Sequence, residues 1–312
     1  MLGAALCRAA SRQGFTFWAP QARFAWSAAQ TLAVQMPAAV EEFAAHVQAG
    51  GEWQVLWAAG TGAMGSTEAH MQTETDAFRW LLECLHAQPR LAGSSGALLL
   101  ASSAGAIYAG SADPTISENS AVAPTTPYAR AKLEQEQLAA SFASRHGGMT
   151  VLIARLSTLY GPGQPSSKPQ GIISHIARRT VRNQPVQIYV PFDTIRDYLH
   201  VNDAAAMCLQ ALGRAQARGG LTTRIIASEV PATIAEIISI FKRLTRRPPR
   251  VVTSASALSR LYMRRVVFRS VEQADAKRRP PIPLMLGIAD VLNAERSSLA
   301  RGTPPARSAA AT

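Results

Sequence analysis

The stretch 97-ALLLASSAGAIY-108 starts as an uninterrupted apolar run and then passes into serines, a glycine and a tyrosine. A Pro- and Thr-rich loop follows it, and the charged segment 128-YARAKLEQEQ-137 comes next. A short apolar run bounded by turn residues predicts a buried strand at Ala97–Ala101, and the charged segment predicts a helix from about Tyr128 to Arg145. A strand that is buried on both faces is typical of a parallel sheet covered by helices.

The segments on either side continue this alternation of strands and helices. Before the quoted stretch we expect helices at Ala38–Gln48 and Ser66–His86, and strands at Phe15–Trp18, Arg23–Trp26 and Trp53–Ala58. After it we expect strands at Thr150–Ala154, Val186–Val190 and Arg224–Ala227, and helices near 171–183, 202–214 and 232–246. The alternation loosens after about residue 165. The sequence therefore predicts an α/β fold, a doubly wound parallel sheet with a smaller C-terminal domain.

The composition excludes several classes of protein. The chain has 312 residues, of which 47% are apolar, enough for a core without the help of disulfides. It contains no run of eighteen or more uncharged apolar residues, which argues against an ordinary membrane-spanning helix. The three cysteines are widely spaced and the six histidines lack metal-ligand spacing. We therefore expect a reducing compartment, the cytoplasm, and no metal site.

The net charge of +12 is distributed unevenly. Residues 1–165 carry 9 basic and 11 acidic side chains, a net charge of −2, whereas residues 166–312 carry 23 and 9, a net charge of +14. A basic half beside a neutral one fits an anionic substrate, a nucleic-acid backbone or a membrane surface. A solvated arginine-rich surface explains the same pattern.

The first forty residues allow two interpretations. They contain Arg8, Arg12 and Arg23 but no acidic residue before Glu41, a composition that organellar transit peptides share. However, a glycine and an aromatic run follow a set of four apolar residues. These four residues form one helical face, namely Leu2, Ala5, Leu6 and Ala9. A helix followed by a strand favours part of a folded α/β unit.

Tyr128 and Lys132 are the clearest candidates for catalytic residues. The two residues are four apart at the start of a helix, so that their side chains lie on one face. An ammonium group near a phenol stabilises the phenolate. The tyrosine can then exchange a proton with a substrate alcohol while a nicotinamide takes or gives a hydride.

Further segments follow this pair in a recognisable order, namely 155-RLSTLYGPGQ-164 and 196-RDYLHVND-203. Together with the serine-containing strand and the Tyr-x-x-x-Lys pair, they resemble the extended short-chain dehydrogenase/reductases, and among these the NAD-dependent epimerase/dehydratases of nucleotide sugars. The resemblance covers about residues 2–250. It implies a Rossmann-type dinucleotide-binding domain over 1–165, N-terminally incomplete, and a mainly substrate-binding domain over 166–312, with a disordered basic tail from about 300.

The resemblance also implies roles for single residues. Tyr128 is the expected acid/base, and Lys132 also binds the nicotinamide ribose. A hydroxyl on the preceding strand is expected to polarise the substrate oxygen. An alignment on Ser102 and the residues after it assigns this role to Ser103, whereas an alignment on Tyr108 places Ala104 there. Arg196 is expected to bind the substrate diphosphate, for which a guanidinium is suited; its alternative is an ion pair with Asp197 or Asp203.

The segment Gly60–Gly65 is a literal G-x-G-x-x-G between a predicted strand and a predicted helix. It has the form of a dinucleotide-binding turn. However, only 68 residues separate Gly60 from Tyr128, which leaves too little chain for a complete nucleotide-binding half. The second interpretation makes Trp53–Ala59 the fourth strand, with Ala59 and Gly60 beside the cofactor. Gly3 is then the last glycine of the phosphate loop, and the true start lies upstream or the chain is a truncated relative.

These observations predict an NAD(P)-dependent epimerase/dehydratase-type oxidoreductase acting on a nucleotide sugar or a similar hydroxyl or keto substrate. NAD and NADP are not distinguished. The alternative is a non-catalytic dinucleotide-binding relative with an impaired cofactor site. We expect no membrane partner, and a homodimer is one assembly that fits. One cluster of basic residues could contact nucleic acid, namely Arg260, Arg264, Arg265, Arg269, Lys277, Arg278 and Arg279. Nucleic-acid binding is disfavoured because no aromatic platform accompanies this cluster.

Overall fold

A central sheet of four parallel strands organises the computed structural model, which describes residues 1–20, 23–48, 50–146, 148–165, 171–254, 263–272 and 280–302. The strands lie in the order β1 (Trp53–Trp57), β2 (Gly96–Ser103), β3 (Thr150–Leu156) and β7 (Gly220–Ile226). β2 pairs with β3 from Ala97 opposite Thr150 to Ser103 opposite Leu156. The predicted strands at 53, 97 and 150 are therefore confirmed.

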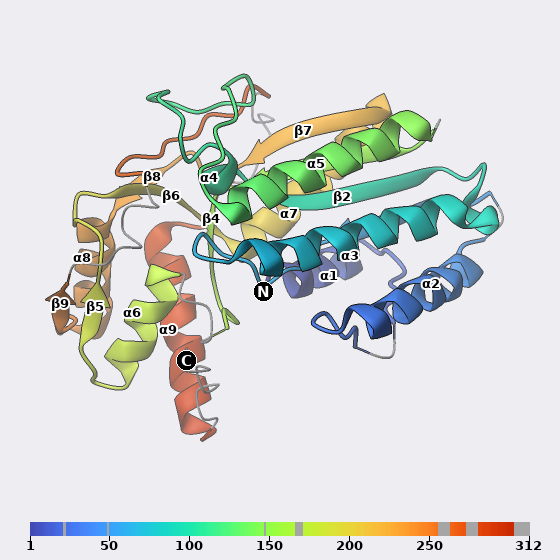
Figure 1. The fold of residues 1–312 in the computed structure, drawn as a ribbon. Coiled ribbons are helices and arrows are strands. Elements are labelled where there is room, and N and C mark those ends of the chain that lie inside the picture. The colour runs from blue at the N-terminus through green and yellow to red at the C-terminus, as the bar shows by residue number, and fades with distance from the viewer. Residues whose placement is uncertain are drawn as a thin grey trace.

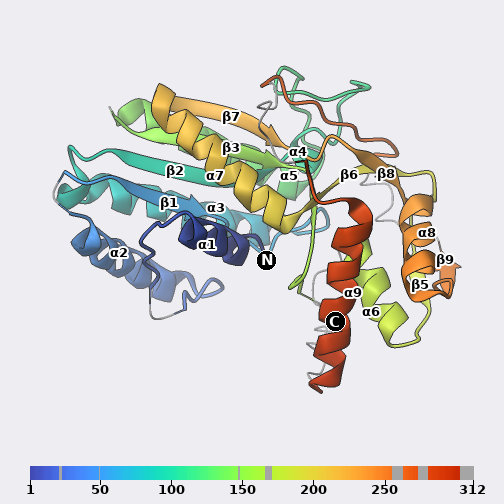
Figure 2. The same ribbon diagram turned by 180° about the vertical axis from the view of Figure 1, so that it is seen from behind.

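Helices cover both faces of this sheet (Figures 1 and 2). One face carries α3 (Glu68–Ala87) and α5 (Pro127–Arg145), and the other carries α1 (Leu2–Arg12) and α7 (Val201–Arg218). Successive side chains of β2 point to opposite faces of the sheet, so this strand contributes to both helix layers. Leu98 and Leu100 pack into the core beneath α3 and α5, whereas Leu99 packs beneath α1 and α7. The doubly wound parallel sheet of the Rossmann type is confirmed.

A second lobe lies beyond one end of the sheet (Figure 1). It contains the sheet β4 (Thr158–Tyr160), β6 (Ile195–His200) and β8 (Pro231–Thr233), and the pair β5 (Val186–Ile188) and β9 (Val251–Thr253). Its helices are α6 (Ile172–Val181), α8 (Ile234–Thr245) and α9 (Leu284–Ala300), which bury one apolar cluster including Ile176, Phe241 and Ile288.

Two predicted strands are wrong. Neither Phe15–Trp18 nor Arg23–Trp26 forms a strand, and their aromatic side chains pack on other rings instead. Trp18 lies 5.7 Å from Phe43 between ring centroids, and Trp26 lies 5.8 Å from Trp57. Aromatic residues favour strands because they pack well on a pleated surface, and here a helix and the edge strand supply the packing.

One helix begins far from its predicted start, and two helices were not predicted. α2 (Ala29–His46) begins nine residues earlier than expected and contains Pro37 in its interior. α4 (Ala104–Ile107) and α9 were not predicted. A short 3-10 helix, η1 (Pro89–Leu91), joins α3 to β2.

The strand expected at Arg224–Ala227 belongs to the first sheet. Its equivalent β7 pairs with β3, and α7 packs on β3 and β7. The chain therefore returns to the sheet after residue 165, and a division into domains at this residue stays a proposal. The predicted tail from about 300 lies outside the described residues from 303 onward.

No helix within the described ranges is long and apolar enough to span a membrane.

The buried His200 in the second lobe predicts a loss of stability in acid. His200 ends β6; its side chain is 0% exposed, and its Nδ1 accepts a hydrogen bond from the Asn202 amide at 3.3 Å. Burial lowers the pKa of His200 from 6.5, although Asp203 and Asp290 act in the opposite direction. Because the unfolded chain takes up a proton near pH 6.5 and the folded state resists it, stability is full above this pH and falls below it.

We expect His200→Asn, which keeps a capping acceptor, to lose less stability between pH 7.5 and 5.5 than the wild type. The difference is at most about 1.4 kcal/mol per pH unit below the unfolded pKa. Urea unfolding at both pH values measures it, and the exposed His46→Asn is the control. Equal losses for His200→Asn and the wild type would contradict the assignment.

Candidate active site

The site lies where β1 and β2 end and α5 begins. The Thr126 side chain caps α5 by accepting a hydrogen bond from the Ala129 amide at 3.2 Å, and Pro127 occupies the first turn. Both features fix the start of the helix, because a threonine cap satisfies a free amide and proline needs none. The cap therefore places Tyr128 in the first turn of α5.

Lys132 lies one turn further along α5 and is only 5% exposed. Its Nζ donates to the Gln135 Oε1 at 3.0 Å and to the Ala101 carbonyl oxygen at 3.4 Å. The same Nζ lies 6.0 Å from the centroid of the Tyr128 ring. The ammonium is thus held between the end of β2 and the tyrosine, as the helical spacing predicts.

The two serines at the end of β2 lie in different surroundings. The buried Ser102 Oγ donates to the Glu136 Oε1 at 2.6 Å. Ser103 is half-buried and precedes α4, and its side chain forms no cap hydrogen bond with that helix. Ala104 is 0% exposed and packs in the core. Of the three residues, Ser103 therefore keeps a hydroxyl outside the core, and its role in the reaction stays a prediction.

The Gly60–Gly65 turn holds a carboxylate of the protein itself. The amides of Thr61 and Gly62 both donate to Glu74 Oε1, at 2.5 and 2.8 Å. Gly60 has a φ of +133°, and a Cβ on it would lie 2.8 Å from Glu74 Oε2. A Cβ on Gly62 would lie 3.1 Å from the Tyr128 ring. The positive φ of Gly60 favours glycine there, a side chain at Gly62 would force its neighbours to move, and the turn adjoins the candidate acid/base.

The other predicted cofactor residues lie on neighbouring elements. Ala59, two residues after the end of β1, is partly buried against the core cluster beneath α3 and α5. Gly3 lies in the first turn of α1, a helix that packs on α7 and contacts β1. No atom lies within 4 Å of the position that a Cβ on Gly3 would take.

Arg196 lies in β6, in the second lobe. Its guanidinium donates to the Ile195 carbonyl at 2.7 Å and to the Met263 carbonyl. The neighbouring Asp197 accepts instead from Ser228, through the amide and the hydroxyl at 2.9 Å each. Asp197 therefore anchors the segment after β7. From the sequence, Asp197 was considered only as a possible ion-pair partner of Arg196.

A buried ion pair behind the site was missed from the sequence. Arg155 on β3 contacts Glu136 on α5, with Nη2 2.6 Å from Oε2, and their side chains are 11% and 5% exposed. The Tyr108 hydroxyl is hydrogen-bonded to the same guanidinium. Burial opposes the charge of Arg155, but the hydrogen bonds and charge of Glu136 raise its pKa overall. The spacing of Glu136, four residues after Lys132 on the same helix face, was the available signal.

The basic cluster considered for nucleic acid is dispersed or outside the described residues. Arg264 pairs with Asp193, and Arg269 with Glu229 at 3.0 Å. Arg260, Lys277, Arg278 and Arg279 lie outside the described residues.

A Rossmann-type sheet with a tyrosine and a lysine one turn apart at its carboxyl edge defines the class of short-chain dehydrogenase-like proteins. The chain belongs to the NAD dependent epimerase/dehydratase family, whose model matches residues 1–223. A dTDP-glucose 4,6-dehydratase of Actinoplanes sp. is 35% identical over 100 residues, which are 32% of this chain and 30% of that one. The chain thus aligns with about a third of the length of its curated relatives.

Solved structures share the fold. The UDP-glucose 4-epimerase of Thermus thermophilus in complex with NAD superimposes with a TM-score of 0.77 at 18% identity, covering 96% of each chain. RMD from Pseudomonas aeruginosa complexed with NADPH gives a TM-score of 0.74 at 23% identity, over 95% of this chain and 96% of that chain.

Proposed function

We propose that this protein is an NAD(P)-dependent epimerase/dehydratase-type oxidoreductase that acts on a nucleotide sugar. The observation that carries this proposal is the position of Lys132 Nζ, which is held between the Ala101 carbonyl and Tyr128. A buried ammonium beside a phenol favours the phenolate, the form that accepts a proton from a sugar hydroxyl. Membership of the family supports the same reaction class.

The residues around Tyr128 fit the nicotinamide-ribose end of a dinucleotide. Lys132 would hold the ribose together with Tyr128. Glu74 Oε2, beside Gly60, is buried and has no hydrogen-bond partner among the described residues. A carboxylate oxygen of this kind suits a ribose hydroxyl, which is a donor. The amides of Thr61 and Gly62 already bind Glu74, so we infer that Gly60–Gly65 is not the diphosphate-binding turn.

NAD(P), when bound, supplies a hydride acceptor for the substrate carbon. The Tyr128 oxygen removes the proton of the substrate hydroxyl and later returns it. Lys132 stabilises the phenolate form of Tyr128, which exists before the first transfer and again after the second. Ser103 donates a hydrogen bond to the same substrate oxygen and so keeps the hydroxyl oriented towards Tyr128.

Recognition of the substrate is assigned to the second lobe. Arg196 presents a guanidinium suited to a diphosphate, and residues 166–312 carry the net charge of +14 that attracts an anion. We therefore propose residues 166–312 as the mainly substrate-binding part, with the exception of α7 and β7, which complete the first sheet. The curated relative that acts on dTDP-glucose supports a nucleotide sugar.

Incubation with NAD and a panel of UDP- and dTDP-hexoses tests the proposal. We expect chromatography to reveal an epimerised, dehydrated or reduced product for at least one sugar. Saturable dinucleotide binding without turnover on the whole panel would instead favour a non-catalytic relative.

A further inference from the structure

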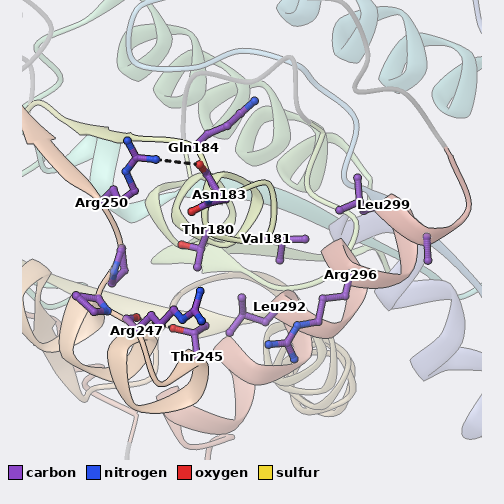
Figure 3. Close-up of a pocket in the computed structure, with 13 residues that line it drawn as sticks. Thr180, Val181, Asn183, Gln184, Thr245, Arg247, Arg250, Leu292, Arg296 and Leu299 are labelled. Carbon is purple, nitrogen blue, oxygen red and sulfur yellow. Dashed lines mark hydrogen bonds between the residues drawn. The ribbon is translucent and has the colours of Figure 1, made fainter.

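A cavity of about 900 Å³ opens in the second lobe between the end of α6, the segment that follows α8 and the end of α9 (Figure 3). This volume lies in the range of small-molecule sites. The cavity is lined by residues of α6, α8, α9 and the segments beside them, whereas Tyr128 and Lys132 lie on α5, which covers the first sheet (Figures 1 and 2). None of its lining residues has a named role in the proposed reaction.

The charge of the cavity wall is one-sided. Arg247, Arg250 and Arg296 line it, and its lining includes no Asp or Glu among the described residues. Arg250 donates to the Asn183 carbonyl at 3.4 Å and Arg296 to the Asn293 side-chain oxygen at 3.3 Å, which are both neutral acceptors.

The nearby carboxylate of Glu295 is already paired with two other arginines. It forms ion pairs with Arg178 at 3.1 Å and with Arg182 at 3.3 Å, the first on α6 and the second directly after it. Glu295 is therefore engaged by these two, and no carboxylate within the described ranges forms an ion pair with any of the three arginines of the cavity. A site with this excess of guanidinium groups attracts an anion.

The other lining residues indicate the chemistry of the rest of the ligand. Thr180 Oγ1, in the wall, is buried and lacks a hydrogen-bond partner within the described part of the chain. A buried hydroxyl without a partner is costly unless a ligand or water satisfies it. Leu292 and the prolines Pro248 and Pro249 add apolar surface. We propose that this cavity binds a phosphorylated small molecule, with its phosphate on Arg247 and Arg296 and its apolar body against Leu292 and the prolines.

Calorimetric titration with phenyl phosphate tests the proposal on the full chain. We expect saturable binding by the wild type and at least a tenfold weaker affinity for the double variant Arg247→Ala/Arg296→Ala. The matched control is Arg12→Ala/Arg243→Ala, which removes the same charge from two exposed helix positions outside the cavity. Phenol, which lacks the phosphate, should not bind.

Hydrogen exchange on the wild type provides a measurement that does not depend on the variants. Phenyl phosphate should protect residues 180–184 and 245–250 and leave the start of α5 unchanged. Equal affinities of the double variant and the control, protection at α5 instead of the cavity, or absence of saturable binding would each overturn the proposal. Binding of polyglutamate without binding of phenyl phosphate would also overturn it, in favour of an acidic protein partner.

Discussion

Tyr128→Phe is expected to lower kcat by about 100- to 10,000-fold, the range that a positioned acid/base contributes. The substitution removes only the hydroxyl, and it leaves the ring that packs against the Gly62 turn. The unfolding midpoint should therefore stay close to that of the wild type. Steady-state assays with the sugar found active in the panel, together with a thermal melt, measure both quantities.

Tyr198→Phe is the matched control for this loss. Tyr198 is buried in β6, and burial raises the pKa of its hydroxyl to about 12, so that it does not exchange protons near neutral pH. We expect Tyr198→Phe to keep kcat within a few-fold of the wild type. Turnover that survives Tyr128→Phe would reject the proton-transfer role.

Glu136→Gln is expected to destabilise the fold by about 3–5 kcal/mol, because it leaves the buried Arg155 charge without its counter-ion. The side chain keeps its shape, but Arg155 loses the carboxylate that its Nε contacts at 3.0 and 3.1 Å. The hydroxyl of Ser102 also loses a charged acceptor. Urea unfolding measures the change in the free energy of unfolding.

An exposed ion pair supplies the comparison. Glu68 lies 2.9 Å from Arg130, with side chains 68% and 51% exposed, and Glu68→Gln should cost at most about 1 kcal/mol. The double variant Glu136→Gln/Arg155→Met should recover part of the stability lost in Glu136→Gln, since no buried charge remains. Similar costs for Glu136→Gln and Glu68→Gln would contradict the buried-charge account.

The sequence predicted the first sheet well because its signals are local. The run at Leu98–Leu100 is apolar on both faces, and α3 carries an apolar stripe of single-helix spacing, so neither needed knowledge of its neighbours. The short strands of the second lobe and α9 are different. α9 is recognised as a core helix only through its packing on α6 and α8, which are distant in the sequence.

The candidate site was predictable to the extent that it depends on helix spacing. Lys132 follows Tyr128 by four residues, and the structure brings its ammonium to the tyrosine. Glu74 and Arg155 could not be assigned in the same way, because their partners, the Thr61 and Gly62 amides and Glu136, come from other elements. An acidic residue whose role is to bind a turn 13 residues earlier leaves no periodic signal.

Titration of the purified protein with NAD and NADP tests the central claim most directly, namely that Tyr128 and Lys132 form the nicotinamide end of a dinucleotide site. We predict saturable binding of one dinucleotide per chain and at least tenfold weaker binding by Lys132→Met. The exposed Lys242→Met on α8 should bind as the wild type does. Absence of saturable binding by the folded wild type, or equal affinity of Lys132→Met in a sample with an intact thermal transition, would contradict the claim.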